Sequence, residues 1–206
     1  MNRYFFASDD TDTSLRLTEV ELIRSFMEEN FNPKDPVLKN KLKMFLDIHA
    51  HSAQRDIFIF APNTANQEDM VKVKNFPTIL NGISPYFSID NCKFGNEKYK
   101  KNCARLAVFR DFNIFHSYTI ESSCWGYSIP YSDDTAQFRD IDFLAFGKHL
   151  ARGIARQFSI HVSEKDITPV PCPGLDIKMD FNLKEEEYSQ ELKQKVKVAK
   201  KKPKVI

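Results

Sequence analysis

Short apolar runs alternate along this sequence with segments of helical periodicity, and this alternation limits the possible folds more than any other feature. The apolar runs have the length and composition of buried strands, and they are residues 44–49, 57–60, 106–109 and 115–121. The periodic segments predict helices over residues 18–30, 66–84 and 143–158. Strands that alternate with helices favour a layered α/β domain.

Local signals refine the predicted helices. Thr18 followed by Glu21 fits a capping box, in which each side chain satisfies a free backbone N–H at a helix start. Pro77 is expected to interrupt the helix over residues 66–84, because proline has no N–H to donate to the preceding turn. A long loop over residues 126–133 precedes the last helix. That helix has a continuous apolar face, formed by Phe143, Phe146, Leu150, Ile154 and Phe158.

The composition excludes several classes of protein. The chain has 206 residues, 42% of them hydrophobic, which is enough for one sizeable core. A formal net charge of +2 gives no indication of nucleic-acid or membrane binding. No apolar stretch approaches the roughly 20 residues of a membrane span, and the residues after Met1 lack the apolar core of a secretory signal. The cysteines form no CxxC pair and are expected to be reduced thiols of a cytosolic protein: Cys92, Cys103, Cys124 and Cys172.

The C-terminal segment differs in composition from the rest of the chain. Residues 184–204 are mostly Lys and Glu and end in a run of lysines broken by Pro203. Such a composition is typical of a solvated tail that is disordered or partly helical. The same charges also suit a basic arm for an acidic partner, or a nuclear-import signal, and the sequence leaves these alternatives open.

One cluster of polar residues ends the first apolar run. In a strand, side chains two residues apart share a face, so Asp47, His49 and His51 are expected to point the same way. Sites of α/β sheets gather at the carboxyl ends of strands, where this cluster lies. Imidazole is a good zinc ligand, and a nearby carboxylate can orient it. A pair of surface histidines at a strand end fits the local pattern equally well.

A single carboxylate, Glu121, ends the β-favouring run 117–123. If this strand lies beside the first one, Glu121 could act as general base for a metal-activated water. A strand that simply finishes in a charged residue is the simpler interpretation of this segment alone.

Two arginines flank the apolar run 106–109. Arg105 could line a pocket and pair with a carboxylate, whereas an ordinary surface ion pair is the commoner outcome for Arg105 and Arg110. His161 and Glu164 have the H-x-x-E spacing of a zinc pair, but they lie beyond the last helix and are expected to be surface residues.

Taken together, these segments resemble the carboxypeptidase A-like metallopeptidases, and most closely their cytosolic, deglutamylating branch. The similar segments occur in the family's order and at its separations, and they are Phe45–Ser52, Phe76–Ser88, Cys103–Arg110, Ser117–Ser123 and Asp142–His149. The resemblance covers roughly residues 1–158. Ala50 and Cys103 are mild departures from the residues usual in the branch.

The resemblance implies roles for individual residues. His49 matches the third zinc ligand and Glu121 the general base, with Asp47 and His51 beside them. The remaining matches concern substrate binding. Asn2 and Arg3 resemble the pair that binds the terminal carboxylate, Arg105 matches a basic residue that receives an acidic side chain, and Tyr99 corresponds to a mobile tyrosine of the wider family.

The implied fold is incomplete. The resemblance corresponds to the C-terminal half of a zinc-carboxypeptidase domain, a partial α/β/α sandwich with a mixed central sheet. It implies that residues 1–160 belong to the catalytic domain, residues 161–183 to an extension and residues 184–206 to the tail. The family's H-x-x-E motif, which carries two of three protein zinc ligands, precedes the segment that Asn2 and Arg3 resemble. The isolated chain is therefore expected to lack both ligands and to be inactive.

The implied activity is zinc-dependent removal of C-terminal residues, glutamates in particular, from the acidic tails of proteins such as tubulin. Acidic, polyglutamate protein C-termini would then be the partners, and the protein would be cytoplasmic and associated with the cytoskeleton. A catalytically inactive remnant that binds acidic tails through Arg3, Arg105 and the basic arm is an alternative. An unrelated hydrolytic metal site formed by His49, His51 and Glu121 is a third possibility.

Overall fold

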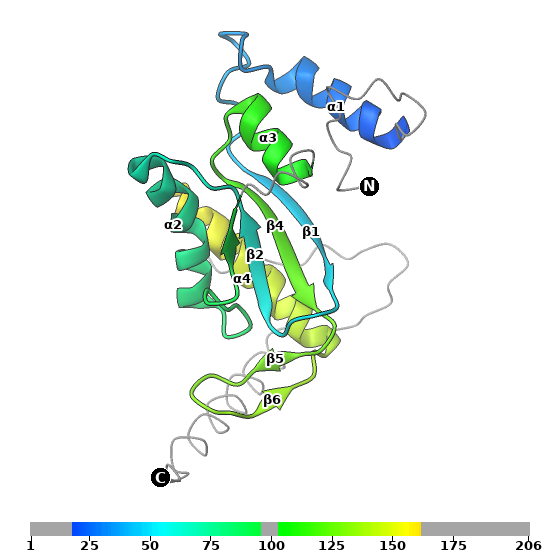
Figure 1. Cartoon of the computed structure of the whole chain (residues 1–206), viewed down its shortest axis with the longest axis vertical. Coiled ribbons are helices and arrows are strands. Elements are labelled where there is room, and N and C mark those ends of the chain that lie inside the picture. The colour runs from blue at the N-terminus through cyan, green and yellow to red at the C-terminus, as the bar shows by residue number, and fades with distance from the viewer. Residues whose placement is uncertain (1–17, 96–102, 162–206) are drawn as a thin grey trace. The chain divides into compact units, whose positions relative to one another are not determined.

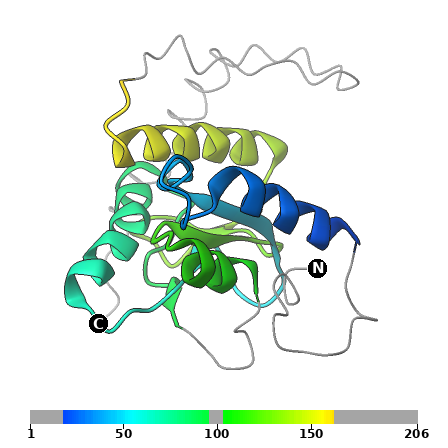
Figure 2. The same cartoon turned by 90° about the horizontal axis from the view of Figure 1, so that it is seen from above.

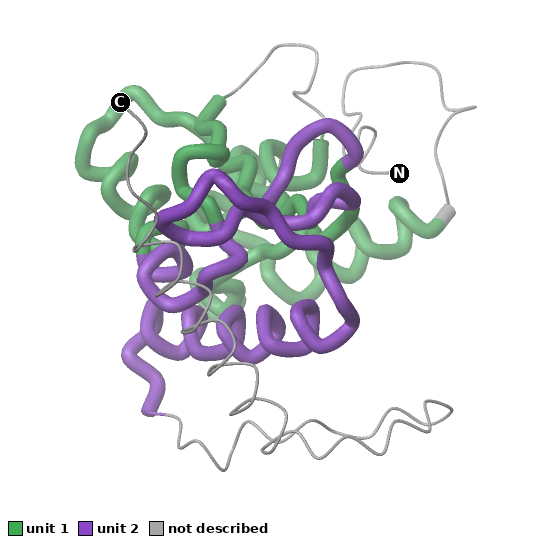
Figure 3. Tube along the Cα trace, turned by 90° about the horizontal axis from the view of Figure 1, so that it is seen from below, with its two compact units in different colours: residues 1–51, 57–78, 88–122 green, residues 52–56, 79–87, 123–206 purple. Residues whose placement is uncertain are grey.

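The structure is a computed structural model, and it describes residues 18–95 and 103–161. These residues divide into two compact units (Figure 3). The first contains residues 18–51, 57–78, 88–95 and 103–122, and the second contains residues 52–56, 79–87 and 123–161. The predicted extension and tail, together with Asn2, Arg3, Tyr99 and Cys172, lie outside the described residues.

The first unit is built on a four-stranded mixed sheet. Its strands are β1 (Phe45–His51), β2 (Ile57–Ala61), β3 (Lys93–Phe94) and β4 (Ser117–Ser123), in the order β1-β4-β2-β3. β2 runs antiparallel to β4 and parallel to β3, while the arrows of β1 and β4 point in the same direction (Figure 1). The predicted strands over 44–49, 57–60 and 115–121 are confirmed, with their ends moved by one or two residues, and so is the mixed α/β class.

The predicted strand over 106–109 is wrong, because this segment lies in helix α3 (Ala104–Phe112). A run of four apolar residues has no periodicity that distinguishes a strand from a buried helix. The helix buries Ala107, Val108 and Phe112 against residues of α1 (Thr18–Phe31), and Figures 1 and 2 show the two helices beside one another. Asn113 then ends α3 in the left-handed conformation, with φ of 55°, which asparagine tolerates better than most residues.

Helix α1 confirms the helix predicted over residues 18–30. Val20 and Met27, two turns apart, are its buried apolar residues in the core shared with α3. The side chain of Thr18 lies outside the described part of the chain, so the capping box stays a prediction.

Helix α2 (Gln67–Ile83) continues through Pro77, so the predicted interruption is wrong. Proline at position 77 removes the N–H that would bond the carbonyl of Val73, four residues earlier. The hydroxyl of Tyr118, on β4, donates to that carbonyl at 2.9 Å, and its ring stacks on Phe76. The tertiary structure thus provides the donor that the helix backbone lacks, which permits an uninterrupted helix.

The second unit contains the strands β5 (Tyr127–Ser128) and β6 (Thr135–Ala136) and the helix α4 (Asp140–Gln157). The predicted loop over 126–133 is therefore part of a short hairpin. Gly126 precedes it at φ +91°, and a Cβ there would collide with the carbonyl of Ala136, so this position requires glycine.

Helix α4 confirms the helix predicted over 143–158 and begins three residues earlier. A capping box at its start explains this difference: the carboxylate of Asp142 accepts the backbone N–H of Arg139 at 2.7 Å. The same carboxylate accepts the hydroxyl of Tyr86 at 3.2 Å. The predicted apolar face is only partly buried, since Phe143 is 43% exposed.

Two further expectations concern the cysteines and the absence of a membrane span. Cys92, Cys103 and Cys124 are free thiols, in agreement with the prediction for the cysteines that the structure describes. Burial and a nearby carboxylate, Asp90, raise the pKa of Cys92 to about 12 even though Ile59 N–H donates to its sulfur. None of the described helices is both long and apolar enough to cross a membrane.

Candidate active site

The central strands bring His49 and Glu121 into contact. β1 and β4 are neighbours, and the Phe45 N–H donates to the His116 carbonyl at 2.9 Å, which aligns their starts. The residues near their ends therefore lie side by side, as the sequence analysis expected for two strands that share a sheet edge. His49 Nδ1 lies 2.9 Å from Glu121 Oε2. The side chain of Glu121 is 5% exposed and that of His49 37%, so a nearly buried carboxylate faces a solvent-accessible imidazole.

Asp47 lies on the other side of the same imidazole. Its Oδ2 is 3.8 Å from His49 Nε2, a separation at which the charge of the carboxylate acts on the ring without a direct hydrogen bond. Asp47 Oδ2 also accepts the hydroxyl of Thr119 at 3.4 Å. Thr119 was not singled out by sequence reasoning, although its position two residues before Glu121 puts both on one face of β4.

His51 points to the same face of β1 but meets different neighbours. Its ring packs edge-on against Phe58 and Phe60 of β2, with centroids 5.0 and 6.2 Å away. Burial lowers the pKa of His51, and the charges of Lys93 and His49 lower it further. His51 thus packs against an aromatic surface, whereas His49 contacts the carboxylate.

Arg105 was predicted to begin a buried strand, but it lies in the first turn of α3. The residue is 4% exposed, its guanidinium carbon lies 5.5 Å from the centroid of the Phe60 ring, and its carbonyl accepts the Ser117 hydroxyl at 2.8 Å. A buried guanidinium over an aromatic ring is a cation–π arrangement, and it differs from the surface ion pair that was the commoner expectation.

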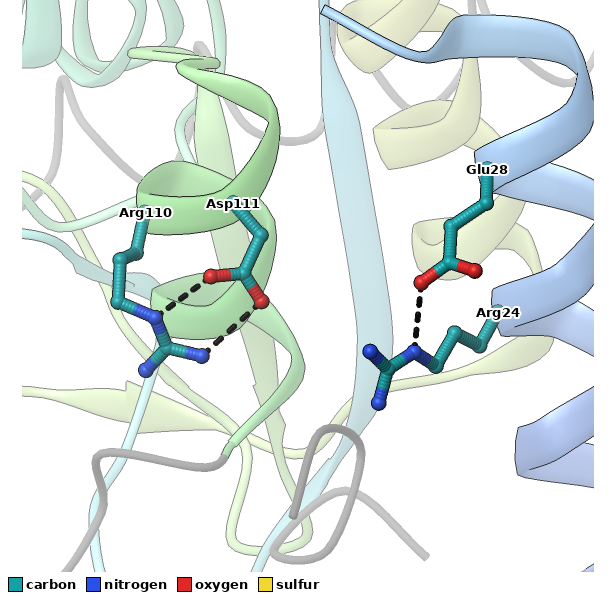
Figure 4. Close-up of polar contacts among 4 residues, drawn as sticks. All are labelled: Arg24, Glu28, Arg110 and Asp111. Carbon is teal, nitrogen blue, oxygen red and sulfur yellow. Dashed lines mark hydrogen bonds and ion pairs between the residues drawn. The ribbon is translucent and has the colours of Figure 1, made fainter. Parts of the chain in front are cut away.

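Arg110, in contrast, makes that ordinary ion pair. Figure 4 shows its guanidinium facing Asp111, with Nε–Oδ1 and Nη2–Oδ2 distances of 2.6 and 3.0 Å. The same figure shows a pair of similar character on α1, between Arg24 and Glu28. Both pairs lie at solvent-accessible positions on their helices.

The described residues do not form a complete metal site. Within residues 18–95 and 103–161, no group of three or more His, Cys, Asp and Glu side chains could hold a metal ion. His49 can supply one nitrogen ligand, and Glu121 is close enough to act on a ligand of the same metal. A catalytic zinc site ordinarily has three protein ligands. His161 is exposed, and its predicted partner Glu164 lies outside the described residues.

The chain was also compared with known proteins. No family model matches the chain. Over 113 residues it is 29% identical to cytosolic carboxypeptidase 2 of Mus musculus, a match that covers 54% of this chain and 13% of that protein. It is 32% identical over 96 residues to cytosolic carboxypeptidase 1 of Xenopus laevis, covering 40% and 8%. The crystal structure of a metallo-carboxypeptidase from Burkholderia cenocepacia superposes with a TM-score of 0.58 and 17% identity, covering 77% of this chain and 38% of that one.

The described residues have the fold of part of a metallocarboxypeptidase. The sequence relatives are cytosolic carboxypeptidases, which this chain resembles at 29% and 32% identity over part of its length. The chain spans about an eighth or less of the length of these curated relatives.

Proposed function

We propose that this chain is part of a zinc metallocarboxypeptidase that removes C-terminal glutamates from acidic protein tails such as those of tubulin. The observation that carries the proposal is the contact between His49 Nδ1 and Glu121 Oε2, at 2.9 Å, where two strands with parallel arrows end. This contact joins the two residues that the family resemblance names as metal ligand and general base. The names of the sequence relatives support carboxypeptidase activity and a cytosolic location.

Zinc would supply Lewis-acid activation of water and of the substrate carbonyl. His49 would provide one ligand, with Asp47 orienting its ring. Glu121 would accept the proton of the attacking water, a role that suits a nearly buried carboxylate at hydrogen-bond distance from a metal ligand. Arg105 would receive the acidic side chain of the terminal residue, and Asn2 and Arg3 would bind its carboxylate. The other two zinc ligands would come from residues outside this sequence.

The experiment that tests the proposal is a glutamate-release assay. The gene is sequenced upstream for an in-frame H-x-x-E segment, the longer protein is expressed, and release of glutamate from a glutamate-tailed peptide is measured with zinc present. We expect release that falls by at least about 100-fold in Glu121→Gln, because general-base catalysis contributes about that factor or more. Arg110→Gln, which alters an exposed ion pair on α3, serves as the matched control.

The outcomes separate the alternatives. A longer protein that binds zinc but releases no glutamate would contradict the proposed activity. Release by the 206-residue chain alone, abolished by Glu121→Gln, would show that no further ligands are needed. A second candidate function, a non-catalytic binding module for acidic tails, is favoured by the absence of a three-ligand group among the residues that the structure describes. A chain that binds glutamate-tailed peptides with no H-x-x-E segment upstream would support it.

A further inference from the structure

Two cations flank one aromatic ring on the face of the sheet that carries Glu121. Arg105 lies over Phe60 from α3, and Lys93 Nζ lies 6.0 Å from the centroid of the same ring. Phe60 is paired with Lys93 on β3 and with Thr119 on β4. Because paired residues of neighbouring strands point to the same face, Lys93, Phe60 and Thr119 share a face, and Glu121 shares it two residues further along β4.

The ammonium of Lys93 lies beside Phe60 on this face of the sheet. Lys93 is exposed, and no ion pair between it and an acidic side chain occurs among the described residues. Lys72 of α2 differs in this respect, since its ammonium lies 2.8 Å from Asp69. An exposed ammonium next to a hydrophobic ring can exchange water for an incoming carboxylate at little cost in desolvation.

The spacing of the strands determines which part of a substrate Lys93 can reach. β3 and β4 are separated by β2, so two strand spacings, about 10 Å, lie between them. An extended peptide covers this distance with about three residues. A chain that reacts beside Glu121 can therefore bring a second acidic residue, close to the terminal one, over Phe60 and Lys93.

We propose that Lys93 is a specificity-determining residue that binds the carboxylate of a second acidic residue near the substrate's C-terminus. The site then recognises a run of acidic residues and not a terminal glutamate alone. This inference rests on the proposed function and deepens it: Arg105 takes the terminal side chain, and Lys93 adds the preference for a second acidic residue within about three residues of it.

The test measures peptide binding to the full 206-residue chain by fluorescence anisotropy. One labelled peptide ends in four glutamates, and a second ends in three glutamines and one glutamate. We expect the wild type to bind the first peptide more tightly, and Lys93→Gln to reduce that affinity by about threefold while changing the second little, as for a solvent-exposed ion pair. Lys93→Arg, which keeps the charge, should restore the preference, and raised salt should weaken it.

The matched control is Lys74→Gln. Lys74 Nζ lies 5.6 Å from the centroid of Phe94, so it makes the same kind of contact as Lys93 but from helix α2 to a different ring. It should leave both affinities unchanged, and the lysines of the C-terminal segment are the same in every variant. Equal binding by Lys93→Gln and the wild type would overturn the inference and leave the proposed function standing. Failure of the wild type to bind either peptide would also overturn the inference, whereas the proposed function is decided by glutamate release from the longer protein.

Discussion

The two faces of strand β4 contrast within a few residues of one another. On one face, Tyr118 and Ile120 are fully buried, and Tyr118 contacts α2 through Phe76 and the Val73 carbonyl. On the other face, Thr119 and Glu121 are also buried but meet the polar side chains of β1. Burial alone therefore does not separate structural from functional positions in this strand. The partners differ: Tyr118 meets Phe76 and a backbone carbonyl of α2 on one face, whereas Glu121 meets the imidazole of His49 on the other.

The largest expected effect on stability comes from the apolar face. Ile120→Ala should lower the free energy of unfolding by about 3 kcal/mol, because it removes buried methylene groups and leaves a cavity. Urea denaturation followed by circular dichroism measures this loss. Glu121→Gln, an isosteric change at the adjacent residue, is the control and should lose much less. Equal losses would mean that the two faces do not differ as described.

A double-mutant cycle tests whether Tyr118 compensates for the missing N–H of Pro77. Tyr118→Phe removes the donor to the Val73 carbonyl and should cost about 2 kcal/mol, as expected for a buried polar group that loses a hydrogen bond. In a Pro77→Ala background, the new N–H at position 77 can bond that carbonyl, so the same substitution should cost less. Denaturation of the four proteins gives the coupling energy. Additive effects would show that Tyr118 does not compensate for the proline.

The same tyrosine leads to a pH dependence. His116 Nδ1 lies 3.1 Å from the Tyr118 hydroxyl; because this hydroxyl donates to Val73, the imidazole must donate to it. Burial lowers the pKa of His116. The unfolded chain therefore takes up a proton at a higher pH than the folded one, and the stability from neutral His116 is lost as the pH falls below about 6.5.

Denaturation at pH 7 and pH 5 tests this dependence. The wild type should lose more stability between these values than His116→Gln does, by at most about 1.4 kcal/mol per pH unit for one proton. His161→Gln, at an exposed position, should behave like the wild type. If His116→Gln lost as much stability between pH 7 and pH 5 as the wild type, His116 would not be the group responsible for the pH dependence.

The smallest expected effect belongs to the surface of α3. Arg110→Ala breaks the exposed pair with Asp111 and should change the free energy of unfolding by less than about 0.5 kcal/mol. Arg105→Met, five residues earlier, removes a buried guanidinium from Phe60 and should have a clearly larger effect. Both changes in the free energy of unfolding are measured by urea denaturation, and equal values would contradict the contrast between the two arginines.

Several elements could be predicted from local pattern alone. The period-two placement of Asp47, His49 and His51 on β1 and the helical period of α4 both follow from the spacing of side chains along the backbone. The order of short motifs also predicted the metallocarboxypeptidase relationship that the comparisons support. The segment over 106–109 could not be predicted correctly, because a short apolar run is compatible with either kind of buried element.

For the candidate site as well, some features could be predicted from the sequence and others could not. The side chains that share a strand face can be identified from the sequence, because that depends only on backbone geometry. The tertiary structure was needed to show that Glu121 contacts His49, that Arg105 and Lys93 lie over Phe60, and that Tyr118 donates to the helix carbonyl opposite Pro77. These contacts join residues distant in sequence, and strand order and packing, not local propensity, determine such pairs.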